Sequence, residues 1–118
     1  MTIGEVSEKY GITTDTLRYY ERIGLIPHVP RKKNGIRDFD EESCKWVSFI
    51  KCMRGAGIQI EALIEYVGLM QEGDSEERRM QILIDQRTKL LNKMEQLQAT
   101  IERLDYKIEL YSQKLKNK

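Results

Sequence analysis

The pattern of hydrophobic positions divides the chain into a head of short helical segments and one long repeat. Over residues 1–73, apolar positions recur at helical spacing only in short runs, which glycine and proline separate. From Ser75 onward there is neither proline nor glycine, and the hydrophobic positions alternate between spacings of three and four. The sequence therefore predicts a mainly α-helical protein, with a compact head over residues 1–73 and a single helix over residues 75–116.

The repeat in the tail is typical of a coiled coil. Its positions are Met80, Leu83, Arg87, Leu90, Met94, Leu97, Ile101, Leu104, Ile108, Tyr111 and Leu115. A helix of this length spans roughly 60 Å, so the head cannot cover the stripe, and a second copy of the chain is the expected partner. We expect that the dimer forms through Leu83, Leu90, Met94, Leu97, Ile101, Leu104 and Ile108. Arg87 interrupts the stripe: it sets the register, pairs with an acidic residue or extends its charge into solvent.

The start of the head has the spacing of a helix-turn-helix. Thr2 and Glu5 form a capping-box pattern for a first helix, and Gly11 is suited to end it. Thr13 or Thr14 then caps a second short helix. Two short helices joined by a tight turn with a glycine are typical of the helix-turn-helix motif.

The second helix should expose a polar face that suits nucleic acid. Asp15, Arg18, Tyr19 and Arg22 recur at helical spacing on one side, whereas Leu17 lies on another. Guanidinium, phenol and carboxylate groups of this kind bond phosphates and base edges, although an ordinary solvated helix face can have the same composition.

A basic hairpin is expected after this helix. Pro27 and Pro30 end the helical region, and Asn34-Gly35 is a strong hairpin signal. The flanking residues are Arg31, Lys32 and Lys33 before the turn and a returning strand of Ile36, Arg37 and Phe39 after it. Such a hairpin is either a wing that lies along a phosphate backbone or a structural element that its lysines keep soluble.

Two further helices should complete the head. Asp40 caps the third, whose buried stripe is expected to be Trp46, Phe49, Ile50 and Met53. A fourth begins near Ile58 and stops near Gly73, and Ser75 is suited to cap the long helix.

Charge and composition narrow the function. The net charge of the 118-residue chain is only +1, yet residues 18–37 hold six basic residues against one acidic residue. No apolar run is long enough for a membrane span or a signal peptide, so we expect neither secretion nor membrane insertion. With one histidine, no glycine-rich phosphate loop and no Cys/His couple, the sequence predicts no catalytic residues, no metal site, no cofactor and no enzyme.

Four segments of the chain resemble the MerR family of bacterial transcriptional regulators. They are Thr2-Ile3-Gly4-Glu5, the run from Thr16 to Ile26 that contains Leu-Arg-Tyr-Tyr-Glu, the run from Asn34 to Phe39, and Phe49-Ile50 through Gly57-Ile58. They follow one another in order over residues 2–70, and the long helix fits the dimerisation helix of the family.

The resemblance implies a winged helix-turn-helix homodimer that is joined by an antiparallel coiled coil and binds a palindromic site in double-stranded promoter DNA. The family distorts the promoter spacer so that RNA polymerase engages both promoter elements. A cytoplasmic protein on the bacterial nucleoid is therefore expected. The expected DNA-binding residues are Thr14, Asp15, Arg18, Tyr19, Tyr20, Arg22, Arg31, Lys32, Lys33 and Arg37.

The same resemblance suggests a signal for the regulator. Residues 70–118 contain no cysteine, which argues against thiolate metal sensing, and the chain stops where many members carry a further sensing domain. A branch of the family that responds to aldehydes and other electrophiles has a cysteine at the place of Cys52. We expect Cys52 to flank the buried stripe of the third helix, and Cys44 to be exposed. Cys52 is either an electrophile sensor or an inert packing residue.

A different class of function fits part of the same pattern. The chain could be an interaction protein whose coiled coil recruits a partner and whose head binds DNA weakly or not at all. The dependence of DNA affinity on salt separates the two, because a head that binds phosphates loses affinity steeply as salt rises.

Overall fold

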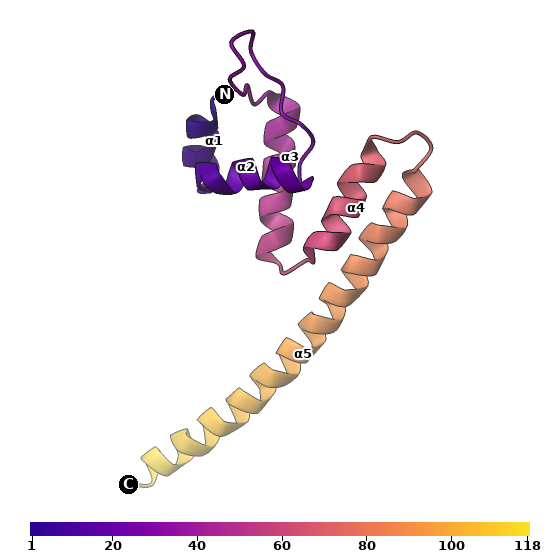
Figure 1. The fold of residues 1–118 in the computed structure, drawn as a ribbon. Helices are drawn as coiled ribbons and strands as arrows, with labels where there is room; N and C mark the ends of the chain where they lie inside the picture. The colour runs from indigo at the N-terminus through magenta and orange to yellow at the C-terminus, as the bar shows by residue number, and fades with distance from the viewer. The chain divides into compact units, whose positions relative to one another are not determined.

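The computed structural model describes all residues from Met1 to Lys118 and is almost entirely helical (Figure 1). Its five helices are α1 (Ile3–Tyr10), α2 (Thr14–Ile23), α3 (Glu41–Gly55), α4 (Ile60–Met70) and α5 (Glu76–Lys116). The expected mainly α-helical fold is confirmed. None of the five helices has the apolar length that crossing a membrane requires.

The first helix begins and ends, and the second begins, where their capping residues predict. Thr2 and Glu5 form a complete capping box at α1, and Gly11 ends it with φ 66°. At α2 the cap is Thr13, whose hydroxyl accepts the Thr16 N–H at 3.1 Å. Gly24 ends this helix with φ 84°, a left-handed conformation that glycine adopts without steric cost.

The segment between α2 and α3 forms a hairpin that is shorter than expected. Only Arg31 and Arg37 are bridged, in antiparallel fashion, so the expected returning strand does not form. In the turn Gly35 has φ 84°, while the Asn34 side chain accepts the Ile36 N–H at 3.2 Å. Because one bridge replaces a ladder, the hairpin depends on other contacts to fix its position. We call residues 29–39 the wing.

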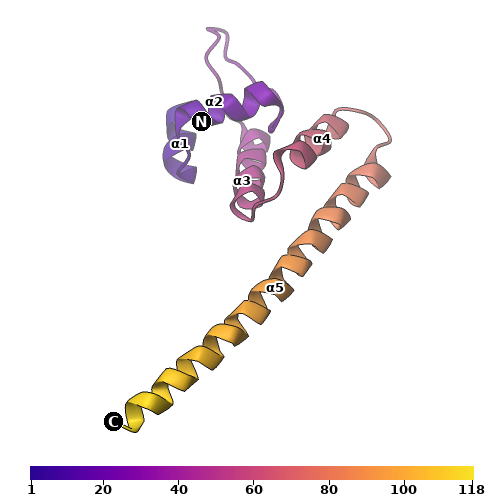
Figure 2. The ribbon, with the colours of Figure 1, turned by 60° about the horizontal axis from the view of Figure 1, so that its bottom comes forward.

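The core of the head lies where α1, α2 and α3 pack together, as the two ribbon views agree (Figures 1 and 2). Its side chains include Val6, Leu17, Leu25, Ile26, Phe39, Val47 and Ile50, all at most 2% exposed. The stripe expected on α3 is therefore wrong except for Ile50. The buried face of α3 is Ser43, Val47 and Ile50, and the other three expected residues are only half-buried.

The head extends into the first turns of α5. One compact unit comprises Met1–Ile82, and Leu83–Lys118 is a second unit. Ser75 precedes α5 as expected, but its hydroxyl donates to the Leu69 carbonyl at 2.6 Å and accepts from Arg79 Nε at 2.9 Å. Arg78 pairs with Glu65 of α4 at 2.5 Å, so the head holds the start of α5 through several polar contacts.

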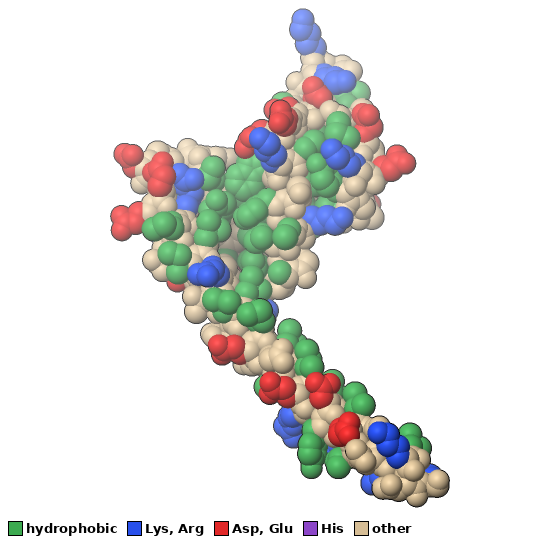
Figure 3. Space-filling model, turned by 180° about the vertical axis from the view of Figure 1, so that it is seen from behind, with side chains coloured by type: hydrophobic (Ala, Val, Ile, Leu, Met, Phe, Trp, Pro, Cys, Tyr) green, Lys and Arg blue, Asp and Glu red, His purple; other side chains and the backbone are tan.

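Beyond Ile82, α5 exposes its hydrophobic stripe. The side chains of Leu83, Met94, Leu97, Ile101, Leu104 and Ile108 are 41–64% exposed, and Leu90 is half-buried. In the space-filling view, hydrophobic side chains lie open to solvent along α5 (Figure 3). Soluble monomers rarely expose so many large apolar side chains in one row, so the stripe is a candidate interface.

Candidate nucleic-acid interface

The exposed face of α2 carries the predicted residues in one row. Arg18 Nη1 donates to Asp15 Oδ1 at 3.0 Å and to Thr14 Oγ1 at 3.5 Å. The Arg22 guanidinium lies 5.4 Å from the centroid of the Tyr19 ring, a cation–π contact. These three contacts between side chains hold two guanidinium groups in place on the surface of the helix.

A hollow of about 550 Å³ separates this face from the wing. It is lined by Arg18, Glu21, Arg22, His28, Val29, Arg31 and Arg37. Four arginines thus face a single carboxylate across a cleft that two chain segments form. We call this cleft the arginine hollow. Arginine binds phosphate oxygens in bidentate geometry, so the arginine hollow suits a phosphate backbone.

Glu21 links the two walls of the arginine hollow. Its side chain is only 8% exposed, and Oε1 accepts from Arg37 Nε at 2.6 Å while Oε2 accepts from the Val29 N–H at 2.7 Å. Burial of the carboxyl group opposes ionisation, but the hydrogen bonds from Arg37 and Val29 favour the ionised form more strongly. The pKa of Glu21 therefore lies below its ordinary value.

The structure separates the basic residues of the wing into two kinds. Lys32 and Lys33 are exposed at the turn, and Arg31 Nη1 donates to the Gly35 carbonyl at 2.8 Å. Arg37 is only 23% exposed and is paired with Glu21, which leaves less of its guanidinium free than the sequence suggests.

Tyr20 also has a structural contact. Its carbonyl accepts the Leu25 N–H at 2.9 Å where α2 ends, and its side chain is half-buried.

Sequence reasoning missed Glu21 and the neighbouring His28. His28 Nδ1 lies 3.8 Å from Glu21 Oε2, although the imidazole itself is 92% exposed. One signal was present in the sequence: Glu21 follows Leu17 by four residues, so both lie on the same face of α2, and Leu17 is a core residue. A carboxylate on that face needs a buried partner, and the nearby arginines supply it.

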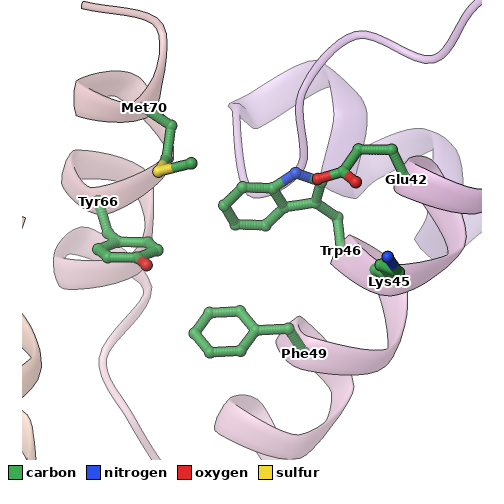
Figure 4. Close-up of a pocket in the computed structure, with 6 residues that line it drawn as sticks. All are labelled: Glu42, Lys45, Trp46, Phe49, Tyr66 and Met70. Atoms are coloured by element: carbon green, nitrogen blue, oxygen red, sulfur yellow. The ribbon is translucent and has the colours of Figure 1, made fainter. Parts of the chain in front are cut away.

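Two of the half-buried residues of α3, Trp46 and Phe49, line an apolar groove. Trp46 and Phe49 of α3 face Tyr66 and Met70 of α4 across a hollow of about 180 Å³ (Figure 4). The three rings contact one another at centroid distances of 5.9–6.1 Å. These aromatic residues therefore pack between two helices at the surface rather than within the core.

Both cysteines are free thiols, and Cys44 is less exposed than we expected. Cys52 is exposed on α3 instead of flanking the buried stripe, whereas Cys44 is half-buried with its Sγ 3.9 Å from Met1 Sδ. Lys51 Nζ donates to the Tyr10 carbonyl, and Arg54 Nη1 donates to the Ile58 carbonyl at 2.5 Å. The two cations next to Cys52 in the sequence are therefore engaged by backbone carbonyls.

Comparisons with known proteins identify this head as a regulatory DNA-reading module. Residues 2–39 match the model of the MerR family regulatory proteins. The crystal structure of a putative MerR family transcriptional regulator from Listeria monocytogenes superposes with a TM-score of 0.92 at 46% identity, over 95% of this chain and 86% of that one. The structure of HiNmlR, a MerR family regulator lacking the sensor domain and bound to promoter DNA, gives 0.85 at 27% identity, over 95% of this chain and 90% of that one.

A curated relative is more similar in sequence. The HTH-type transcriptional regulator AdhR of Bacillus subtilis is 59% identical over 92 residues, which is 77% of this chain. The match spans 66% of AdhR, just under two thirds of its length. The chain belongs to the MerR family. Its relatives are transcriptional regulators, which confirms that it is not an enzyme.

Proposed function

We propose that the chain binds a palindromic promoter site as a homodimer and regulates transcription there. The arginine hollow carries this proposal, because it places guanidinium groups of α2 and of the wing around one cleft. The similarity to HiNmlR supports the same use of the head. In this proposal Arg18, Tyr19 and Arg22 read the major groove, with Thr14 and Asp15 beside them. Tyr20, Arg31, Lys32, Lys33 and Arg37 contact the phosphate backbone.

The dimer forms through α5, whose exposed stripe meets the same stripe of a second copy. An isologous pairing of this kind presents two heads to two half-sites, which is why the site is palindromic. An antiparallel arrangement also keeps Arg87 of one chain away from Arg87 of the other, because the two chains then run in opposite directions along the seam. By the mechanism of the family, the bound dimer distorts the spacer of the promoter and RNA polymerase then engages both elements.

The dependence of binding on salt tests the proposal. The probe is a double-stranded DNA fragment selected by the native chain from a random library. If both hollows contact phosphates, affinity falls roughly 1,000-fold or more between 50 and 200 mM salt. A shallow dependence, or failure to select any duplex, would instead favour a coiled-coil interaction protein.

We also propose that Cys52 senses aldehydes or other electrophiles. Exposure of its thiol on α3 supports this, because an electrophile reaches it without unfolding of the head. The sulfur adds to the carbonyl carbon of an aldehyde, and the carbonyl oxygen takes up the proton, so a hemithioacetal forms without a leaving group. The alternative that Cys52 only packs is less favoured, since the side chain is exposed rather than buried.

Formaldehyde or methylglyoxal provides the test. We expect the intact mass of the native chain to rise and transcription from its promoter to switch, whereas Cys52→Ser shows neither response. Cys44→Ser is the matched control and should respond as the native chain does. Equal responses of the native and Cys52→Ser chains would assign Cys52 to packing.

A further inference from the structure

The carboxylate of Glu21 connects α2 to both ends of the wing. One oxygen accepts the Arg37 guanidinium at 2.6 Å, after the turn, and the other accepts the Val29 N–H at 2.7 Å, before it. The two oxygens thus hold the outgoing and the returning segments of one hairpin. Both contacts are sheltered, because the side chain of Glu21 is 8% exposed.

The other hydrogen bonds of the wing join it to itself and to the N-terminus. Its only sheet pairing is the bridge between Arg31 and Arg37, and Lys32, Lys33 and Asn34 are exposed. Two-stranded hairpins are marginally stable in water. Within the hairpin, the Lys32 N–H donates to the Ile36 carbonyl at 2.8 Å and the Asp38 N–H donates to the Pro30 carbonyl at 2.7 Å. At its base Phe39 is buried and exchanges two backbone hydrogen bonds with Met1, whose ammonium group also pairs with Asp38 at 3.3 Å. These contacts join the wing to itself and to the core, whereas the carboxylate joins it directly to α2.

The negative charge of Glu21, taken alone, would weaken DNA binding rather than support it. It is the one carboxylate in the arginine hollow, so its negative charge opposes the approach of a phosphate backbone. If it contributed only charge, its removal would strengthen DNA binding. If it holds the wing, its removal would weaken binding, because the guanidinium groups of the wing would lose their fixed position relative to those of α2.

We propose that Glu21 is a positioning residue, which fixes the wing against α2 so that the arginines of both segments meet DNA as one surface. This rests on the proposed function and names a residue outside the expected set of DNA contacts. Glu21 itself touches no DNA in this proposal. The cost of its negative charge is outweighed by the order that it gives the wing.

Glu21→Gln in the full-length chain separates the two effects. The amide oxygen still accepts one hydrogen bond, but the amide nitrogen is a donor and faces a second donor. We expect the affinity for the library-selected duplex to fall about tenfold, and its salt dependence to become shallower by about one to two phosphate contacts. Hydrogen exchange of the Val29, Lys32 and Asp38 amides in the free protein should accelerate, while exchange of the α3 amides stays unchanged.

Glu8→Gln is the matched control, since it removes the same charge from an exposed position on α1. It should bind DNA as well as the native chain or slightly better. If Glu21→Gln behaves like Glu8→Gln, or if its wing amides keep native protection, Glu21 does not position the wing.

Two further outcomes are decided by the same measurements. If the amides of Glu21→Gln exchange faster throughout the head, this variant has a general folding defect, and Arg37→Lys is tested in its place. Arg37→Lys retains both charges of the ion pair but lacks the guanidinium group. Weaker binding with faster exchange confined to the wing then supports the proposal, and native behaviour overturns it. If the native chain binds no duplex, the proposed function fails, whereas hydrogen exchange still decides whether Glu21 fixes the wing.

Discussion

Leu97→Glu is expected to separate the dimer into folded protomers and to abolish tight promoter binding. Leu97 is 63% exposed in the single chain, so a charge there costs the protomer little. In the proposed coiled coil the same position is buried in the seam of both copies. Each copy then loses about 1.5–3 kcal/mol of hydrophobic burial, and two carboxylates enter an apolar interface. The dissociation constant of the dimer should rise roughly 100- to 10,000-fold.

The loss of DNA affinity follows from the loss of the dimer. Two linked heads bind two half-sites with an avidity that typically exceeds single-site binding by a factor of about 10²–10⁴. A protomer with an intact arginine hollow should therefore bind one half-site weakly and still respond to salt. Sedimentation measures whether the variant is a monomer or a dimer. Comparing its binding to duplexes with one and with two half-sites measures how much the linkage of two heads increases the affinity.

Ala99→Glu is the control for charge on α5. It places the same carboxylate two residues further along, on the side of the helix away from the stripe. This variant should remain a dimer with native affinity for DNA. A dimeric Leu97→Glu chain would contradict the register of the stripe, and two monomeric variants would show that charge anywhere on α5 prevents association.

Local chemistry explains why the helix boundaries were predictable. The capping box of Thr2 and Glu5 and the left-handed Gly11 are contacts within one helix turn, so the sequence encodes them without reference to the rest of the fold. The same holds for Asp40, which accepts the Ser43 N–H at 2.8 Å at the start of α3. The hydrogen bond from Ser43 lowers the pKa of Asp40, as expected for a carboxylate at a helix N-terminus.

Packing between helices explains what the sequence did not predict. On α3 two rows have helical spacing: Ser43, Val47 and Ile50 form one, and Trp46, Phe49 and Met53 form the other. Periodicity favours neither, and the larger aromatic residues suggested the wrong row. The packing of α1 against α3 decides the matter, and the smaller side chains of α3 lie in the core.

The candidate interface also has one part that local sequence predicts and another part that depends on the tertiary fold. The face of α2 with Arg18 and Arg22 follows from helical spacing alone, and the structure keeps both guanidinium groups in the arginine hollow. The pairing of Arg37 with Glu21 joins residues sixteen positions apart. It depends on how the wing folds back, which no local pattern specifies. The stripe on α5 is exposed as its spacing predicted, and its pairing with a second copy stays a prediction.

Arg18→Ala is expected to weaken promoter binding while the dimer remains intact. Arg18 lies on the exposed face of α2, where Asp15 Oδ1 accepts from its Nη1 at 3.0 Å and orients the guanidinium. A specific arginine–base contact is worth about 1–3 kcal/mol, and a palindromic site has two of them. Affinity for the selected duplex should therefore fall roughly 100-fold. Sedimentation should still report a dimer, because the substitution is not on α5.

The mode of contact is read from sequence preference and salt together. If Arg18 bonds a base edge, the variant loses discrimination at one position of each half-site, and its salt dependence changes little. If Arg18 bonds a phosphate, affinity falls equally for all sequences, and the salt slope decreases by about one per half-site. Arg103→Ala removes the same charge from an exposed position on α5 and should retain native affinity. Equal losses in both variants would mean that net charge, rather than the position of Arg18 in the arginine hollow, determines how tightly the head binds DNA.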